Sequence, residues 1–448
     1  MKNQYAYSFR YFGLLVSGSL GLLVLGGLCL AQQSPQSEPL RMRTELRNLN
    51  QFSDFCYLRD HEVAYEEAGG QLYQDFVQAM GVSYAFHGNY EKATYYYDYL
   101  WPKLRGSEGA FVPPDIGNQK DWEASMQNYE AISVNEFLRN HAEEYSLIMF
   151  NEAHHSAQHR MLTRAALPML KAAGFTYLAL EALRNPPSDT PSFSGRDYPL
   201  RTDGYYVQEP QFGNLIREAL ALGFTLVPYE CTRLQWETMP QGNTSMNFRD
   251  SCQAQNIYQQ TFGVDPQAKV VVHAGLGHID EEGGPVSKPM GAYLKALAQT
   301  DPLTLDQTRL RETPHQAFEE HPYRWVLSSF EIEQPSVLQK KDGTLYASWM
   351  EGLVDAWVVF PPSQSLHGRP DWLFREGVTM VEVPQDMVEM YEDCLVRAIP
   401  FSEPDQAIPV DQHLIEPGAV LALTKGKLKL QVIHSSEQKI SEQILVVE

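Results

Sequence analysis

Histidine and carboxylate side chains crowd into one short stretch of the chain, directly after an apolar run. Residues 147–150 have the length and bulk of a buried strand, and Glu152, His154 and His155 follow at once. A histidine oriented by a carboxylate can take a proton from water, which contributes roughly 10²–10⁴-fold in rate. The residue types in this stretch therefore favour hydrolytic chemistry.

Three later apolar runs end in the same kinds of residue. They are 175–180 with Glu181, 224–229 with Glu230, and 269–272 with His273 and His278. A helical pattern precedes each run, and open α/β sheets bind ligands at the carboxyl ends of their strands. One carboxylate after a strand is often only a helix cap, but four such ends at one sheet edge favour a shared pocket.

We predict two groups of side chains in this pocket. The catalytic group is Glu152, His155, Glu181 and His278, and the residues that surround it and bind substrate are His154, Glu230, Arg249 and His273. One histidine would act as the base, while a second histidine and Arg249 would polarise the substrate carbonyl. The same set could instead bind a divalent metal, since two or three histidines with one glutamate form a catalytic zinc pattern.

The surrounding pattern predicts an α/β protein with a central sheet, flanking helices and two further parts. The sheet domain covers residues 130–312, after a helical segment at 32–129 and before a β-rich domain at 325–448. Within the sheet domain, Pro168 predicts a kink or a fresh start in a helix that ends before Gly174.

The two flanking parts carry weaker signals. Residues 81–97 resemble one tetratricopeptide repeat, and because a single repeat cannot form a solenoid we expect a helical hairpin that covers the sheet. A Pro-rich excursion at 184–210 is predicted as a lid or substrate wall. In the β-rich domain, the run 326–332 is predicted as a strand, and nothing there has catalytic spacing.

Composition and the first 31 residues indicate where the protein acts. The net charge of −21 argues against nucleic acid and anionic membranes as partners and leaves a small-molecule or peptide substrate. Residues 1–31 have the layout of a signal peptide, which predicts a periplasmic or secreted protein. The alternative is an uncleaved membrane anchor. Four cysteines follow, Cys56, Cys231, Cys252 and Cys394, and we expect one disulfide or none.

The motif residues give the chain a family resemblance over about residues 130–310. It resembles the erythromycin esterase and ChaN-like superfamily, which is related to the TraB and Tiki proteins. The resemblance rests on Glu152-Ala153-His154-His155, the strand-ending Glu181, the helix with Arg249 and Asn256, and the motif from His273 to His278. Asn151 stands where the superfamily usually has glycine.

The resemblance implies a function without fixing the cofactor. Esterase-like spacing points to Glu152 and His155, whereas ChaN-like spacing points to Glu152 and His154, and the sequence satisfies both. Esterase-type relatives imply an ester or amide hydrolase without metal, and Tiki-type relatives imply a metal. The alternative is a periplasmic haem- or iron-binding protein that uses His154, His155 or His278. A scaffold built on the helical hairpin would leave the polar cluster unexplained.

Overall fold

The computed structural model describes residues 51–104, 118–185, 193, 195–284, 287–315, 319, 322–375, 377–390 and 394–448. The predicted signal peptide lies outside these residues. Among the helices in the described ranges, none is both long and apolar enough to cross a membrane.

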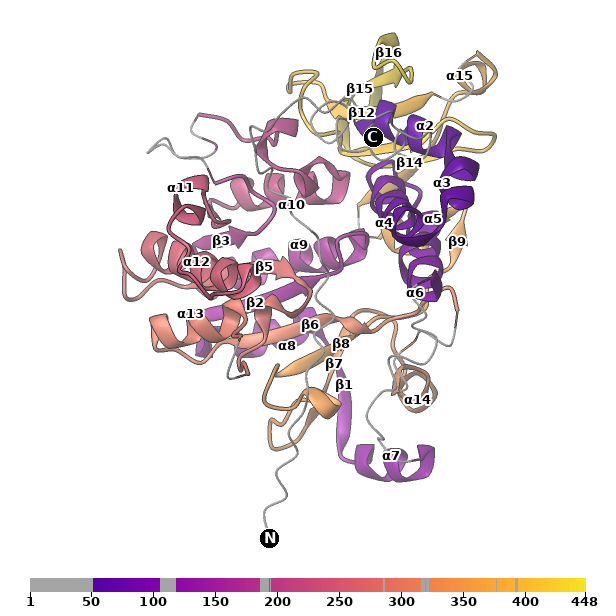
Figure 1. Ribbon diagram of the computed structural model, residues 1–448. Helices are drawn as coiled ribbons and strands as arrows, with labels where there is room; N and C mark the ends of the chain where they lie inside the picture. Colours follow the sequence, from indigo (N-terminus) through magenta and orange to yellow (C-terminus); the bar gives the residue numbers. More distant parts are fainter. Residues whose placement is uncertain are drawn as a thin grey trace.

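A mixed sheet of eight strands forms the centre of the molecule (Figure 1). Its spatial order is β1-β7-β8-β6-β2-β5-β3-β4. The strands are β1 Tyr129–Ser133, β2 Leu147–Glu152, β3 Tyr177–Leu180, β4 Thr225–Pro228, β5 Val270–Gly275, β6 Leu303–Leu310, β7 Ser336–Lys340 and β8 Ala356–Val359. The six strands from β8 to β4 run parallel, while β7 is antiparallel to β8 and to β1. This arrangement confirms the predicted α/β class.

The register of the parallel strands gathers the polar strand ends. Glu152 at the end of β2 pairs with Gly275 on β5, and Leu180 at the end of β3 pairs with His273. Strands β2, β5, β3 and β4 are consecutive neighbours, as the four apolar runs predicted. Their carboxyl ends therefore meet at one edge of the sheet.

Helices cover both faces of the sheet, because alternate strand residues point to opposite sides. On one face Ile148 and Phe150 pack with helices α8 Val134–His141, α9 Ala157–Ala172 and α10 Pro210–Ala221. On the other face Leu147 and Met149 pack with the remaining helices of the domain. These are α7 Gln119–Met126, α12 Ser245–Gln260, α13 Met290–Ala298 and α14 Pro322–Ser329.

Two predictions about individual elements are wrong. Helix α9 runs from Ala157 to Ala172 without a fresh start at Pro168, since its apolar side is buried against the sheet on both sides of the proline. The run 326–332 is not a strand, because α14 occupies Pro322–Ser329. Its buried residues Tyr323 and Val326 lie three apart, which is helical spacing, and a run this short fits either period.

The N-terminal helices pack against the C-terminal strands rather than over a face of the central sheet. They are α2 Gln51–Asp60, α3 Glu62–Ala68, α4 Gly70–Phe86, α5 Tyr90–Thr94, the π-helix η2 Tyr95–Leu100 and α6 Trp101–Leu104. Phe55 and Phe76 share a core with Leu395 and Ile433, and Figure 1 shows these helices beside the C-terminal strands. Helices α4 and α5 form the predicted hairpin.

The C-terminal strands form smaller sheets of their own. They are β9 Ser365–Leu366, β10 Arg369–Pro370, β11 Val378–Glu382, β12 Leu395–Pro400, β13 Asp411–Leu414, β14 Val420–Thr424, β15 Gly426–Ile433 and β16 Lys439–Val447. Strand β11 pairs with β14, and the order β13-β12-β15-β16 forms a four-stranded sheet. Since β7 and β8 belong to the central sheet, the separate β-rich part begins after β8.

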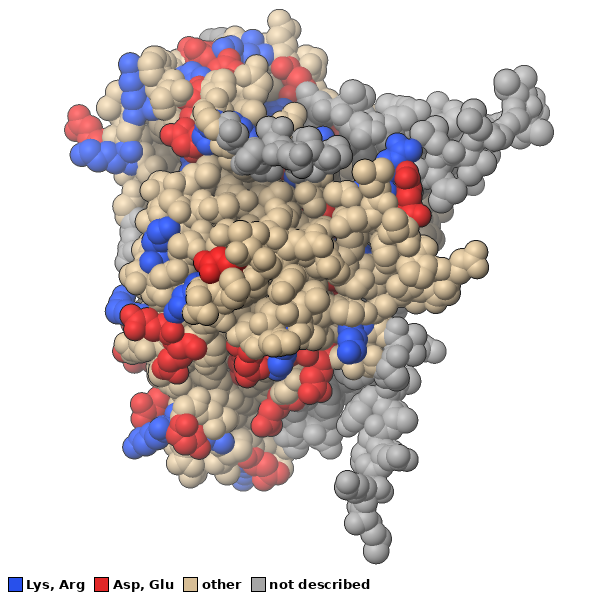
Figure 2. Space-filling model, turned by 90° about the vertical axis from the view of Figure 1, so that its left-hand side faces the viewer, with Lys and Arg blue, Asp and Glu red and all other residues tan. Residues whose placement is uncertain are grey.

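Short elements connect this framework. They are η3 Ala142–Glu144, η4 Arg201–Asp203, η5 Tyr206–Gln208, α11 Arg233–Trp236, η6 Leu276–Ile279, η8 Ser348–Met350, η9 Asp371–Phe374 and α15 Gln385–Met390. Figure 2 shows the side of the molecule on which α11, α12 and α13 lie, with acidic and basic side chains mixed above and below a band that holds few of either. In this view the negative charge is not gathered into one acidic surface.

Candidate active site

Glu152 ends β2 and lies at the centre of a buried polar network. Its Oε2 accepts a hydrogen bond from Nε of Arg160 at 2.6 Å, and its Oε1 accepts one from Nη2 at 2.9 Å. Nε2 of His273 lies 2.8 Å from Oε2. Burial alone would raise the pKa of Glu152, but the Arg160 charge and the hydrogen bonds from His154 and His273 hold it well below its usual value. Glu152 is therefore a buried carboxylate that stays ionised.

His154 follows Glu152 and is oriented by it. Nδ1 lies 2.7 Å from Oε1 of Glu152, and the ring stacks on Tyr206 with the centroids 4.0 Å apart. An ionised carboxylate can only accept, so Nδ1 donates and Nε2 keeps its lone pair. Nε2 has no hydrogen-bond partner among the described residues, and the side chain is 11% exposed. His154 thus has the tautomer of a general base.

Glu181 approaches His154 from the end of the neighbouring strand β3. A Cβ atom added at Gly275 would lie 2.8 Å from Nε2 of His154 and 3.1 Å from Oε2 of Glu181, so both atoms border the same point. The amide of Gly275 donates to Glu181. Burial would raise the pKa of Glu181, but the charges of Arg249, His278 and His154 hold it below its usual value.

Arg249 joins the glutamates of two strand ends. It projects from α12, and its Nη2 donates to both Glu181 and Glu230 at 2.5 Å. Its Nε lies 3.0 Å from Oε2 of Glu230, and Gln253 donates to the same oxygen at 3.1 Å. Arg249 is 25% exposed and Glu230 31% exposed, so this side of the network reaches the surface.

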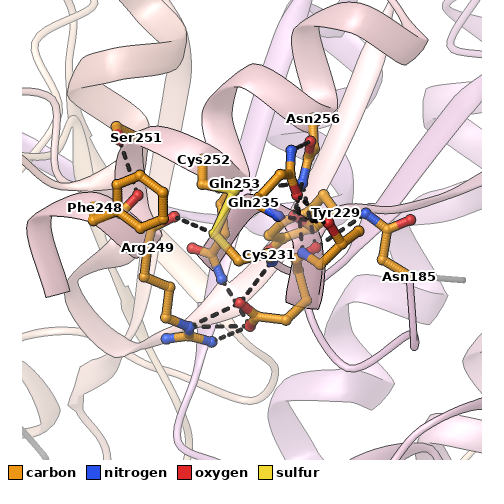
Figure 3. The surroundings of a disulfide bond; sticks show 12 residues. Asn185, Tyr229, Cys231, Gln235, Phe248, Arg249, Ser251, Cys252, Gln253 and Asn256 are labelled. Atoms are coloured by element: carbon orange, nitrogen blue, oxygen red, sulfur yellow. Dashed lines mark hydrogen bonds and ion pairs between the residues drawn. A yellow bond between two sulfur atoms is a disulfide. The ribbon is translucent and has the colours of Figure 1, made fainter. Parts of the chain in front are cut away.

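A disulfide fixes α12 to the end of β4 at this point. Cys231 follows Glu230, and its bond to Cys252 anchors the helix turn that carries Arg249. Figure 3 shows Arg249, Cys252 and Asn256 extending from α12 toward the segment in which Cys231 lies. Nδ2 of Asn256 donates to the backbone oxygen of Glu230 at 3.2 Å. The structure thus forms one disulfide, within the expected range of one or none.

His278 is the second histidine near Glu181. Its Nδ1 is hydrogen-bonded to Asp250 of α12, and its neutral ring accepts a hydrogen bond at Nε2 from Arg249 over 3.1 Å. Burial opposes its charged form, but the carboxylates of Asp250 and Glu181 together raise the pKa of His278. His278 is therefore placed to gain and lose a proton beside Glu181.

The two remaining histidines have supporting contacts. His273 is buried between Glu152 and Thr163, whose Oγ1 lies 3.0 Å from Nδ1. His155 is also buried, but Nε2 lies 3.0 Å from Asp98 of the N-terminal helices, and its ring stacks on Tyr97 at 4.0 Å. Burial lowers the pKa of His155.

The structure connects seven of the eight predicted site residues and places His155 apart, against the N-terminal helices. Sequence reasoning missed several partners of the site, which are Asp98, Arg160, Tyr206, Glu209 and Asp250. Arg160 had a local signal, because it lies on the first turns of the helix that follows the Glu152 motif. Asp98 had none, since 57 residues separate it from His155.

The donor set does not fit a divalent metal. Glu152 is bonded to Arg160 and Glu181 to Arg249, so an ion at either carboxylate would lie beside a guanidinium charge. In the described part of the chain, no group of three or more His, Cys, Asp and Glu side chains is arranged to hold a metal ion. Of the three histidines predicted as haem ligands, His154 is the one with a ring nitrogen open to a ligand and a partly exposed side chain.

Comparison with known proteins adds little. No protein-family model and no curated protein matches the chain. Similar solved structures include the type III effector HopBA1 at 14% identity, over 40% of this chain and 86% of that chain, with a TM-score of 0.27. RRSP, a MARTX toxin effector domain from Vibrio vulnificus, matches at 16% identity over 52% of this chain and 44% of that chain, with a TM-score of 0.29.

A third similar structure is the C-terminal region of Pasteurella multocida toxin, which was described with a thiol-protease-like catalytic triad. It matches at 11% identity over 79% of this chain and 55% of that chain, with a TM-score of 0.27. The chain therefore spans about half the length of two of these three structures. At such TM-scores the likeness carries no argument about function.

Proposed function

We propose that the protein is a hydrolase that cleaves an ester or amide bond with His154 as its general base. The observation that carries the proposal is the pairing of His154 with the buried, ionised Glu152, which leaves Nε2 free to accept a proton. Arg160 keeps Glu152 charged, so the carboxylate stabilises the imidazolium that forms instead of taking the proton itself.

The reaction follows from this tautomer. Nε2 of His154 removes a proton from water while the water oxygen forms a bond to the substrate carbonyl carbon. The negative charge that develops on the carbonyl oxygen is stabilised by Arg249 and by His278 when it is protonated. Collapse of the tetrahedral intermediate breaks the bond to the leaving oxygen or nitrogen, and the proton on His154 passes to that atom. The products are an acid and an alcohol or amine.

Membership in the erythromycin esterase and ChaN-like superfamily is part of the same proposal. Its support is the Glu152-x-His154 spacing together with strand-ending Glu181 and the motif from His273 to His278. We also propose that the protein acts after export, in the periplasm or outside the cell. The signal-like residues 1–31 and the Cys231–Cys252 disulfide both favour an oxidising compartment.

Activity measurements on histidine variants test the proposal. Wild-type protein, His154→Gln and a control, His141→Gln, are assayed on a panel of nitrophenyl esters and anilides. His141 lies on α8, and its side chain is 35% exposed. We expect His154→Gln to lose roughly 10²–10⁴ in kcat with a similar melting temperature, while the control keeps both. Full activity in His154→Gln would place the base elsewhere.

Spectroscopy separates the hydrolase from the haem-binding alternative. A visible spectrum and metal analysis of protein purified from the exported fraction should show neither a Soret band nor a stoichiometric metal. A Soret band that disappears in His154→Gln would instead support haem binding through that residue. A panel that gives no turnover with the wild type would count against the proposed hydrolase.

A further inference from the structure

Asp98 ties the N-terminal helices to the rear of the site. It lies in the π-helix η2, is 8% exposed, and its Oδ2 is 3.0 Å from Nε2 of His155. The same carboxylate accepts two hydrogen bonds from Arg311, at 2.6 Å and 2.8 Å. Arg311 directly follows β6. Asp98 therefore links three segments that are far apart in the sequence.

His155 is clamped by this contact and by its stacking on Tyr97. The ring planes of Tyr97 and His155 are 17° apart and their centroids 4.0 Å apart, so one ring face is covered while Nε2 is bonded to Asp98. His155 is the chain neighbour of His154, so the clamp restrains the backbone on one side of the base. Nη2 of Arg160 donates to the backbone oxygen of His154 at 2.7 Å and restrains it further.

The π-helix explains how adjacent side chains reach the same clamp. In η2 the three consecutive residues Tyr96, Tyr97 and Asp98 are all buried. A π-helical turn is wider than an α-helical one, and such turns occur frequently at functional sites. Gly81 of α4 lets this turn pack closely, because a Cβ atom there would lie 2.9 Å from Cβ of Tyr97.

Tyr90 makes a second link from the same hairpin. Its hydroxyl donates to Oε1 of Glu209 at 2.8 Å, and Oε2 of Glu209 accepts from Nη1 of Arg160 at 3.1 Å. Arg160 in turn holds the carboxylate of Glu152. Glu209 and Arg160 are fully buried, so this chain of contacts is shielded from water.

We propose that the N-terminal helical hairpin is part of the active site, with Asp98 positioning His154 through His155 and Tyr90 positioning Glu152 through Glu209 and Arg160. This inference rests on the proposed function. Neither residue touches the substrate, and each acts through a group that orients the Glu152–His154 pair. Losing such a supporting contact typically costs 10–100-fold in activity at metal sites, and we expect a loss of that order here.

A double-mutant cycle tests the role of Asp98. Asp98→Asn, His155→Gln and the combined variant are compared with the wild type. Each single change should lower kcat about 10–100-fold with little change in KM. Because both remove the same clamp, the combined variant should be little worse than the worse single one. Losses that multiply, or kcat unchanged in His155→Gln, would overturn the proposal.

A control in the same π-helix separates positioning from general destabilisation. Tyr96→Phe removes the hydrogen bond from its hydroxyl to Glu62, outside the site, and should leave kcat at the wild-type value. Asp98→Asn leaves Arg311 without its carboxylate, so this variant can fail to fold. His155→Gln keeps the pair of Asp98 and Arg311 and then decides the question.

Nuclear magnetic resonance gives a readout that does not depend on turnover. The ring proton on Nδ1 of His154, bonded to Glu152, should shift or broaden in Asp98→Asn and His155→Gln but not in Tyr96→Phe. If no substrate is turned over and this signal still responds, the proposed function fails while the positioning stands. If turnover is present and the signal does not respond in either variant, the positioning is wrong.

Discussion

At the scale of single residues, Gly275 controls how closely the two parts of the site approach. It occupies the point between His154 and Glu181, and its amide donates to Glu181. An alanine there would place Cβ 2.8 Å from the ring of His154, which is closer than such contacts normally come. The ring must then move off the position set by Glu152.

We therefore predict that Gly275→Ala lowers kcat by one to two orders of magnitude, since small misplacements of reacting groups can cost about 10²-fold. Gly277→Ala is the matched control, because the nearest atom to its added Cβ is Oδ2 of Asp280 at 3.4 Å, an ordinary contact. Kinetics and thermal melts of both variants provide the measurement. Equal kcat in the two variants would show that the position of His154 does not matter.

Residue types alone could identify only part of this site. Glu152 and His154 were found because a strand-ending carboxylate and a nearby histidine suit proton transfer. Arg160 was not assigned to the site, because an arginine within a helical pattern normally faces water, and its complete burial depends on Glu152 and Glu209. Tyr206 reaches His154 from the predicted lid region, a contact that no local pattern encodes.

At the scale of elements, the disulfide between Cys231 and Cys252 holds α12 against β4. The two cysteines are 21 residues apart in sequence, and closing a loop of that size stabilises the fold by roughly 3 kcal/mol. We predict that Cys231→Ser combined with Cys252→Ser lowers the free energy of unfolding by about 2–4 kcal/mol. Urea denaturation measures the change.

Activity should survive this change at temperatures well below the melting point. Gln253 and Asn256 still hold Glu230, and Arg249 keeps its carboxylate partners. Added reductant should destabilise the wild type and leave the double-serine protein unaffected. A double-serine protein as stable as the wild type would mean that noncovalent contacts alone fix α12.

Elements were predictable where the pattern was strong and local. The four apolar runs became β2, β3, β4 and β5, because each is buried on both faces of a parallel sheet. The assignment of β7 and β8 to the same sheet was not predicted, because pairing with β1 and β6 is decided by contacts across the chain. The helix α14 was mistaken for a strand for a related reason.

At the scale of the whole molecule, two neutral histidines lie on the N-terminal helices and the C-terminal strands that pack together. Burial lowers the pKa of His87 to about 4, and it lowers the pKa of His413 to about 4 as well. The folded pKa lies below the ordinary 6.5, so the unfolded chain binds the proton first as pH falls. Stability is therefore present above pH 6.5 and is lost between pH 6.5 and 4.

We predict a loss of up to about 3 kcal/mol from each histidine across that window. The free energy of unfolding of His413→Gln should fall less between pH 7 and pH 4 than that of the wild type. His61→Gln, a change at an exposed position between α2 and α3, should leave the wild-type pH dependence unaltered. An identical pH dependence in His413→Gln and the wild type would contradict this role.

The packing of the N-terminal hairpin on the C-terminal strands also sets an order of assembly during synthesis. Asp98 and Tyr90 emerge from the ribosome early, but their hairpin rests on Leu395 and Ile433, which are made last. Contacts of such long sequence separation form slowly. A nascent or prematurely terminated chain would carry Glu152 and His154 without their support from the hairpin, so the full-length product would be the first species able to act on a substrate.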